Sequence, residues 1–295
     1  MIRHCPLLER DTPTTLLPFA PAPWVLRRCD ESGFVFLENP PGYDALHETF
    51  AWEATFKAES AARKRSEPVR YSASQAMKRF RSRVLKRNKV CELAVGELMR
   101  ARVDRPLNGI DGGVATPTNP SRINLLDLGC GLGGMLVKVM ERLPPALRAR
   151  CAPHGVEIST EQARIADATL SQAGGRCVHS DAIHGLTLFE PDFFDVIILS
   201  SFLEHETRPL PLLRNCFTHL RPGGAVIIKV PNFDSINRTL RGDKWCGFRW
   251  PDHVNYFTPS TLRTMAGLAK LHVARMNFFD RQPLSDSLYA VLRKA

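Results

Sequence analysis

The residues with the clearest chemical potential are a group of glycines that follows a run of apolar residues. Residues 125–134 read LLDLGCGLGG, so an acid stands two positions before the first glycine. Glycine lets the backbone adopt dihedral angles closed to other residues and approach a ligand closely. If a helix begins at this point, its first N–H groups lack intrahelical partners and attract an anionic or polar ligand. The segment therefore predicts a strand, a binding turn and a helix.

Two nucleotide cofactors are compatible with this spacing. Gly129, Gly131 and Gly134 match the GxGxxG pattern of dinucleotide-binding turns. Asp127 argues instead for S-adenosyl-L-methionine (SAM), because a carboxylate repels a pyrophosphate and a sulfonium ligand tolerates it. An NAD-dependent oxidoreductase is thus the less favoured interpretation.

Two further acids follow the next two predicted strands. Glu157 ends one of them, where a carboxylate can accept both hydroxyls of a ribose. Asp181 follows the other, where it can accept a hydrogen bond from an adenine amine. Because the carboxyl ends of parallel strands meet along one edge of a sheet, the glycines and both acids are expected to converge on one crevice.

The elements that position these residues alternate between strand and helix. Such alternation predicts an α/β fold, with a doubly wound and mostly parallel sheet joined by right-handed crossovers. One short hairpin is expected earlier, over residues 26–38. One expected helix follows the glycine turn and ends near residue 143, and three others cover residues 160–172, 210–220 and 258–270. The expected strands cover residues 123–128, 152–157, 176–179, 194–199, 225–230, 272–278 and 288–293.

Residues 122–294 resemble a class I SAM-dependent methyltransferase. The resemblance implies a seven-stranded Rossmann-like sheet whose last strand is antiparallel, and the transfer of a methyl group from SAM. Its markers, besides the glycine turn, are GVE at 155–157, SDA at 180–182, FDVII at 194–198, LEH at 203–205 and LRPGG at 220–224.

The same resemblance implies which residues hold the cofactor. Ser200, at the end of the strand over 194–199, is expected near the sulfonium. The other expected contacts are Asp127, Gly129, Cys130, Gly131, Gly133, Glu157, Ile158, Asp181 and Ala182.

The chain is also similar to ubiquinone-type methyltransferases that carry an N-terminal zinc ribbon. The ribbon's cysteine pairs are degenerate here, because Leu8 and Ser32 stand where the second cysteine of each pair is expected. Structural zinc requires four nitrogen or sulfur ligands, and Cys5, Cys29 and His4 supply three at most. We therefore expect no metal in this leader, and the sequence assigns no metal site elsewhere.

Two histidines are the candidate catalytic residues. His253 lies in a polar segment with Trp245, Trp250 and Tyr256 that resembles the subgroup and could form a lid, although a structural hydrogen bond would equally explain it. His205 belongs to the LEH motif, with helix capping or packing as its alternative role. If the methyl acceptor is a hydroxyl, a histidine is suited to take its proton near neutral pH.

The positive charge of the chain is concentrated in one segment. The 295 residues carry a net charge of +10, and residues 61–105 hold fourteen basic and four acidic residues, an excess of the same size. A long helix is predicted over residues 72–104, with an apolar stripe that includes Met77, Phe80 and Val84. We expect three parts: a leader over 1–60, this basic helix with a linker over 61–121, and the SAM-binding domain over 122–295.

The leading interpretation is a SAM-dependent methyltransferase acting on a small molecule such as a quinone precursor, secondary metabolite or surface sugar. One alternative is an RNA-directed methyltransferase that uses the basic helix, but only Phe80 supplies an aromatic platform among its charges. The NPPGY sequence at 39–43 is interrupted by Gly42 and does not match the signature of nucleic-acid amino-methyltransferases. A non-catalytic SAM-fold interaction protein is the other alternative.

No stretch of the sequence is both apolar enough and long enough to span a membrane. We expect a cytoplasmic protein whose cysteines are free thiols.

Overall fold

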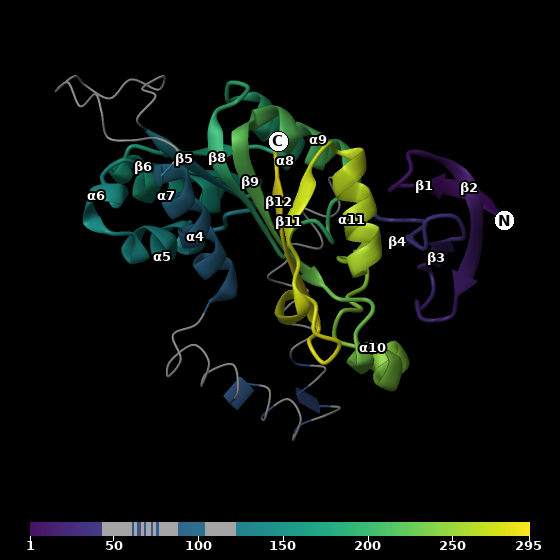
Figure 1. Cartoon of the computed structure of the whole chain (residues 1–295). Helices are drawn as coiled ribbons and strands as arrows, with labels where there is room; N and C mark the ends of the chain where they lie inside the picture. The colour runs from purple at the N-terminus through teal and green to yellow at the C-terminus, as the bar shows by residue number, and fades with distance from the viewer. Residues whose placement is uncertain are drawn as a thin grey trace.

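The computed structural model describes residues 1–42, 88–103 and 122–295, together with scattered single positions between 61 and 76. These residues form two sheets with helices around them, labelled as in Figure 1. No helix among the described residues is both long and apolar enough to cross a bilayer.

The larger sheet has seven strands in the order β11-β12-β9-β8-β5-β6-β7. All neighbours of β5, β6 and β8 are parallel, and β12 runs antiparallel to both β9 and β11. This confirms the predicted seven-stranded sheet with an antiparallel last strand. Its strands are β5 (Ile123–Leu128), β6 (Cys151–Glu157), β7 (Arg176–His179), β8 (Phe194–Ser200), β9 (Leu220–Pro231), β11 (His272–Arg275) and β12 (Ser287–Arg293).

Helices cover both faces of this sheet, as a doubly wound fold requires. Successive side chains of β8 alternate between the faces, so Ile198 packs with α4, α5 and α7, and Ile197 packs with α8, α9 and α11. Figure 1 shows α4, α5 and α7 on one side of the sheet and α11 on the other. The helices are α4 (Lys89–Val103), α5 (Gly134–Arg142), α6 (Pro145–Arg148), α7 (Thr160–Leu170), α8 (Ala182–Thr187), α9 (Pro209–His219), α10 (Ile236–Arg241) and α11 (Pro259–Leu268), with 3-10 turns η1 (Ser171–Ala173), η2 (Gly242–Lys244) and η3 (Phe278–Asp280).

The second sheet joins the N-terminal segment to a late part of the chain. Its order is β1-β2-β3-β4-β10, and β3 and β4 form the hairpin predicted over residues 26–38. The strand β10 pairs antiparallel with β4, which places Asn255 opposite Phe36. The N-terminal sheet is thus completed by a segment that follows β9. Its strands are β1 (Ile2–Cys5), β2 (Arg10–Leu17), β3 (Leu26–Cys29), β4 (Val35–Leu37) and β10 (Asn255–Tyr256).

The degenerate cysteine positions are filled by hydrogen bonds and packing. The Sγ of Cys5 lies 3.7 Å from Ser32 Oγ, and the Sγ of Cys29 lies 3.3 Å from Thr12 Oγ1. Both thiols are buried, and Leu8 packs against the core that they join. At the two substituted positions, Ser32 therefore hydrogen-bonds and Leu8 packs, and the zinc-ribbon resemblance stays a prediction.

The long helix predicted over residues 72–104 differs from the structure at one end. Asn88 is not helical, and its Oδ1 accepts a hydrogen bond from Cys91 N (3.2 Å), so Asn88 caps a helix that begins at Lys89. Most of residues 72–87, including Met77, Phe80 and Val84, lie outside the described residues.

Candidate functional site

The glycine turn between β5 and α5 requires glycine for steric reasons. Gly129, Gly131 and Gly133 have φ values of +70°, +56° and +78°, which other residues rarely adopt. A Cβ on Gly129 would lie 2.5 Å from Cδ2 of the Phe202 ring. The turn therefore brings its backbone against the loop that follows β8.

Glu157 holds this turn from the neighbouring strand. Its Oε2 accepts a hydrogen bond from Gly131 N (2.8 Å), and its Oε1 accepts one from Ser159 N (3.0 Å). A carboxylate offers about four lone-pair positions. Glu157 therefore retains acceptor capacity for ligand hydroxyls at the place where sequence reasoning expected a ribose.

Asp127 lies deeper than its place in the motif suggested. Asp127 is buried in β5, where its backbone lies opposite Gly155 of β6 and Ile198 of β8. Burial, followed by the nearby charge of Glu157, raises the pKa of Asp127 well above its usual range. The repulsion of a pyrophosphate by this residue, which argued against a dinucleotide, is correspondingly weakened.

Asp181 closes the same edge of the sheet and caps α8. Its Oδ1 accepts hydrogen bonds from Ile183 N (3.0 Å) and His184 N (3.1 Å), and its Oδ2 contacts the His184 ring. A pocket opens between Asp181 and the glycine turn. It is lined by Gly129, Val156, Ile158, Ser180, Asp181, Ala182 and Phe202.

The loop after β8 completes this edge. Ser200 ends β8 beside Lys229 of β9, but it does not line the pocket; the next two residues do more to shape the site. Ser201 has a φ of +57°, and its Oγ accepts a hydrogen bond from Lys229 Nζ (3.0 Å). Phe202 lies over Gly129. Sequence reasoning assigned no site role to Ser201, Phe202 or Lys229, because their positions depend on this turn.

Comparison with known families decides what this site belongs to. A family model described as a methyltransferase domain matches residues 97–273, a span that includes the glycine turn, both acids and the loop after β8. The chain belongs to this methyltransferase family.

The relatives of this methyltransferase include enzymes named ubiquinone biosynthesis O-methyltransferase. The one from Cupriavidus pinatubonensis is 30% identical over 181 residues, which cover 57% of this chain and 68% of the relative. The one from Paraburkholderia xenovorans is 27% identical, with 55% and 69% covered. A methyltransferase structure from Mesorhizobium loti is similar at 17% identity with a TM-score of 0.44, covering 60% of this chain and 94% of the other.

SAM is the cofactor of this methyltransferase, as the sequence predicted. The residues around the pocket suit an adenosyl group chemically, since the glycine turn brings bare backbone to the carboxyl edge of the sheet and Glu157 offers acceptors beside it. Gly129, Ile158, Asp181 and Ala182 line the pocket itself. The contacts of the individual predicted residues with SAM stay a prediction.

The two histidines predicted to be catalytic are brought together, 48 positions apart in the sequence. The ring centroids of His205 and His253 lie 4.7 Å apart, with an interplanar angle of 84°. The Nδ1–H of His205 donates to the carbonyl of Asp252 (2.9 Å), and the Nδ1–H of His253 donates to that of Gly247 (2.7 Å). Each ring therefore presents its Nε2 to the space between them.

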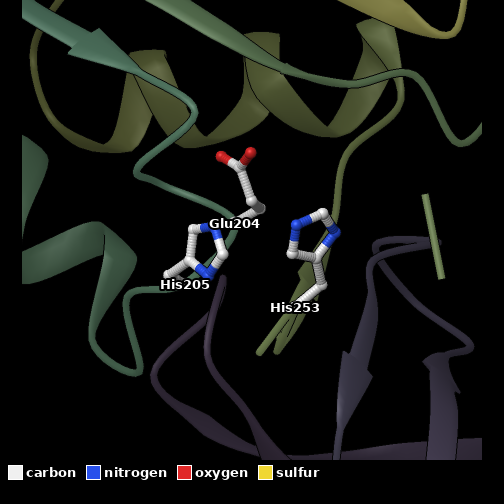
Figure 2. Close-up of side chains that lie close together, drawn as sticks. All are labelled: Glu204, His205 and His253. Carbon is white, nitrogen blue, oxygen red and sulfur yellow. The ribbon is translucent and has the colours of Figure 1, made fainter. Parts of the chain in front are cut away.

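Glu204 joins this pair, and Figure 2 shows its carboxylate above the two rings. Burial raises the pKa of Glu204 to about 7. Burial, followed by the charge of Arg249, lowers the pKa of His205 to about 4, so that this ring is neutral near pH 7. Sequence reasoning quoted Glu204 only as part of the LEH motif.

The backbone explains why these side chains meet. Val254 N and Asn255 N donate to the carbonyl of Glu204 (2.8 and 3.0 Å). The buried Asn255 amide donates to the carbonyls of Leu203 (3.1 Å) and Glu206 (2.6 Å). The segment around His253 is thus fastened to the loop after β8.

The aromatic residues predicted to form a lid are packed instead. Trp245 and Tyr256 are buried, and Trp250 packs against the same cluster, which also contains Phe248 and Leu26. The Nε1–H of Trp245 donates to Asp286 Oδ1 (2.7 Å). These rings fix the base of the segment that carries His253.

Proposed function

We propose that this methyltransferase transfers the methyl group to an oxygen atom of a small molecule of the quinone-precursor type. One observation carries the proposal: Phe202 lines the cofactor pocket, and the same loop places Glu204 and His205 in the cluster with His253. Phe202, beside the pocket, therefore precedes Glu204 and His205, which can accept a proton, by two and three positions in the sequence.

Methylation of a hydroxyl needs both alignment and loss of a proton. SAM, when bound, supplies a methyl group on a sulfonium. The protein has to hold the acceptor oxygen in line with that methyl group, and such positioning supplies much of the rate. Glu204, His205 and His253 form the polar wall that faces the acceptor, and His253 and His205 are the candidates for contact with its hydroxyl.

The names of the relatives support an oxygen acceptor. They are O-methyltransferases of ubiquinone biosynthesis, with a ring hydroxyl as the simplest corresponding substrate class. The described residues offer no observation that favours RNA, because most of the basic segment lies outside them.

The test is a product analysis with matched acceptors. Purified protein and SAM are incubated with phenols, catechols and the corresponding anilines, and products are identified by mass spectrometry. We expect methylation of hydroxyl compounds, with kcat for His253→Gln reduced about 100-fold and SAM affinity unchanged. His219→Gln is the matched control, since His219 is buried with a similar Nδ1 bond to a carbonyl, that of Asn215 (2.9 Å), outside the site.

Two outcomes contradict this proposal. Methylation of anilines without hydroxyl compounds would assign a nitrogen acceptor. Methylation of RNA, with no small molecule of the panel modified, would favour the RNA-directed alternative.

A further inference from the structure

We propose that Glu204, His205 and His253 form a binding site for a divalent transition-metal ion. One ligand atom from each of these side chains lies within 4.8 Å of the other two. Figure 2 shows the three side chains close together, with the carboxylate above the two rings. Two imidazoles and one carboxylate are a ligand set typical of zinc and non-haem iron sites.

The orientation of both rings is fixed as metal sites require. A metal-binding histidine usually donates its other N–H to a carbonyl or carboxylate, which sets the tautomer and the direction of the ligand atom. His205 and His253 do so through Nδ1, with the carbonyls of Asp252 and Gly247 as acceptors at 2.9 and 2.7 Å. Their Nε2 atoms are therefore the candidate ligand atoms.

Two of the candidate ligand atoms accept no hydrogen bond from any described residue. Glu204 Oε2 and His205 Nε2 are buried and have no hydrogen-bond partner there. Buried polar atoms are nearly always satisfied, since an unpaired one destabilises the folded state. A cation between them would satisfy both atoms at once.

The charges around the cluster select the kind of cation. Lys229 and Arg249 are the positive charges that act on Glu204. Lys229 donates to Ser201 Oγ, and Arg249 lies 3.8 Å from Asp252 Oδ2. Both positive charges also oppose a cation, so ions bound mainly by charge, such as Ca²⁺ or Mg²⁺, are disfavoured against those that bond strongly to imidazole.

The proposed ion would connect two segments that are far apart in the sequence. His205 lies in the loop after β8, and His253 precedes β10 of the second sheet. Since the unfolded chain does not hold these ligands together, metal binding is expected to raise the melting temperature.

The experiment uses untagged protein from which metal has been removed with a chelator. Binding of Zn²⁺ is measured by calorimetric titration, and binding of Co²⁺ by titration followed in visible absorption. We expect one ion per chain and a Co²⁺ spectrum of nitrogen and oxygen ligands. Binding should weaken at least about 10-fold in His253→Gln and in Glu204→Gln. His219→Gln and Glu206→Gln are the matched controls; Glu206 is a buried neighbour outside the cluster, and both controls should bind as the parent does.

Three results would overturn the proposal. The first is a folded parent protein that binds neither ion. The second is binding retained in both cluster variants but lost in Cys29→Ala, which would place the ion at the N-terminal thiols. The third, decisive even if the variants do not fold, is a parent Co²⁺ spectrum dominated by thiolate charge transfer. No substrate is present in these measurements, so their result is independent of the proposed oxygen acceptor.

Discussion

At the scale of single residues, the cofactor turn depends on one close approach. The backbone of Gly129 lies directly beneath the Phe202 ring, and Glu157 ties Gly131 to the next strand. Any side chain at Gly129 must displace the Phe202 ring, which lines the pocket beside the glycine turn. Steric fit and backbone conformation therefore both matter at this position, and they can be separated by experiment.

Gly129→Ala is expected to weaken SAM binding at least about 10-fold, because the new Cβ meets Phe202 in addition to the cost of a positive φ. Gly223→Ala is the matched control, since Gly223 has a φ of +75° and open space around its Cβ position. That control should lose about 1 kcal/mol of stability and keep its SAM affinity. Calorimetric titration measures the SAM affinity of the two variants, and equal affinities would contradict the steric argument.

At the scale of elements, the start of α4 is fastened to the turn between β11 and β12. Asp280 in η3 is buried; its Oδ1 lies 2.8 Å from Lys89 Nζ, and its Oδ2 accepts from Arg275 Nε (3.1 Å). Burial acts to raise the pKa of Asp280, but the hydrogen bonds from Lys89 and Arg275 outweigh it and the pKa is lowered. The ion pairs thus hold a helix end against the edge of the sheet.

Because its pKa is lowered in the folded state, Asp280 stabilises the protein fully at pH values above its unfolded pKa of about 4. This contribution is lost as the pH falls through the lower pKa of the folded state. Asp280→Asn should therefore cost about 2 kcal/mol at neutral pH and progressively less below about pH 4. Urea unfolding at several pH values measures the difference. Glu161→Gln is the control, because the Glu161–Arg164 pair is exposed and should contribute little to stability. If the cost of Asp280→Asn stays constant across the acid range, the proposed link between its pKa and stability is wrong.

At the scale of the whole molecule, the two sheets share one apolar core. Cys5 and Phe34 of the N-terminal segment pack in the same cluster as Leu262 and Met265 of α11. Figure 1 shows the second sheet beside α11. The strand β10 also joins the N-terminal sheet to the segment that carries His253, so the N-terminal segment supports the site indirectly.

A shared core predicts that both sheets unfold together. Three of the four tryptophans, Trp24, Trp245 and Trp250, lie in or near the second sheet, so tryptophan fluorescence reports largely on that sheet. Far-ultraviolet circular dichroism reports chiefly on the helices around the larger sheet. The two transitions in urea should coincide. Separate midpoints would show that the N-terminal sheet is an independent unit.

The basic segment gives a second prediction at this scale, made from the sequence. Replacing Arg79, Arg83, Lys86 and Arg87 by Gln removes four of its positive charges. If the segment serves a small-molecule enzyme, SAM binding and the fold should survive this change. Salt-sensitive RNA binding by the parent that the variant loses would instead support an RNA substrate.

Much of the larger sheet could be predicted because its signals are local. The strand over Ile123–Leu128 has four apolar residues in six and is followed directly by glycines, and a strand buried on both faces needs little else to specify it. The glycine turn was predictable for the same reason, since its positive φ values favour glycine at three alternate positions, 129, 131 and 133.

The second sheet and the histidine cluster depend on contacts between distant residues. β4 has three residues and β10 has two, so neither carries a periodic pattern, and Asn255 pairs with Phe36 across more than two hundred positions. The meeting of His205 with His253 rests on backbone bonds from Val254 and Asn255 to Glu204. Such pairing has no signal in either segment alone, because it forms only when the folded sheet brings their unpaired backbone groups together.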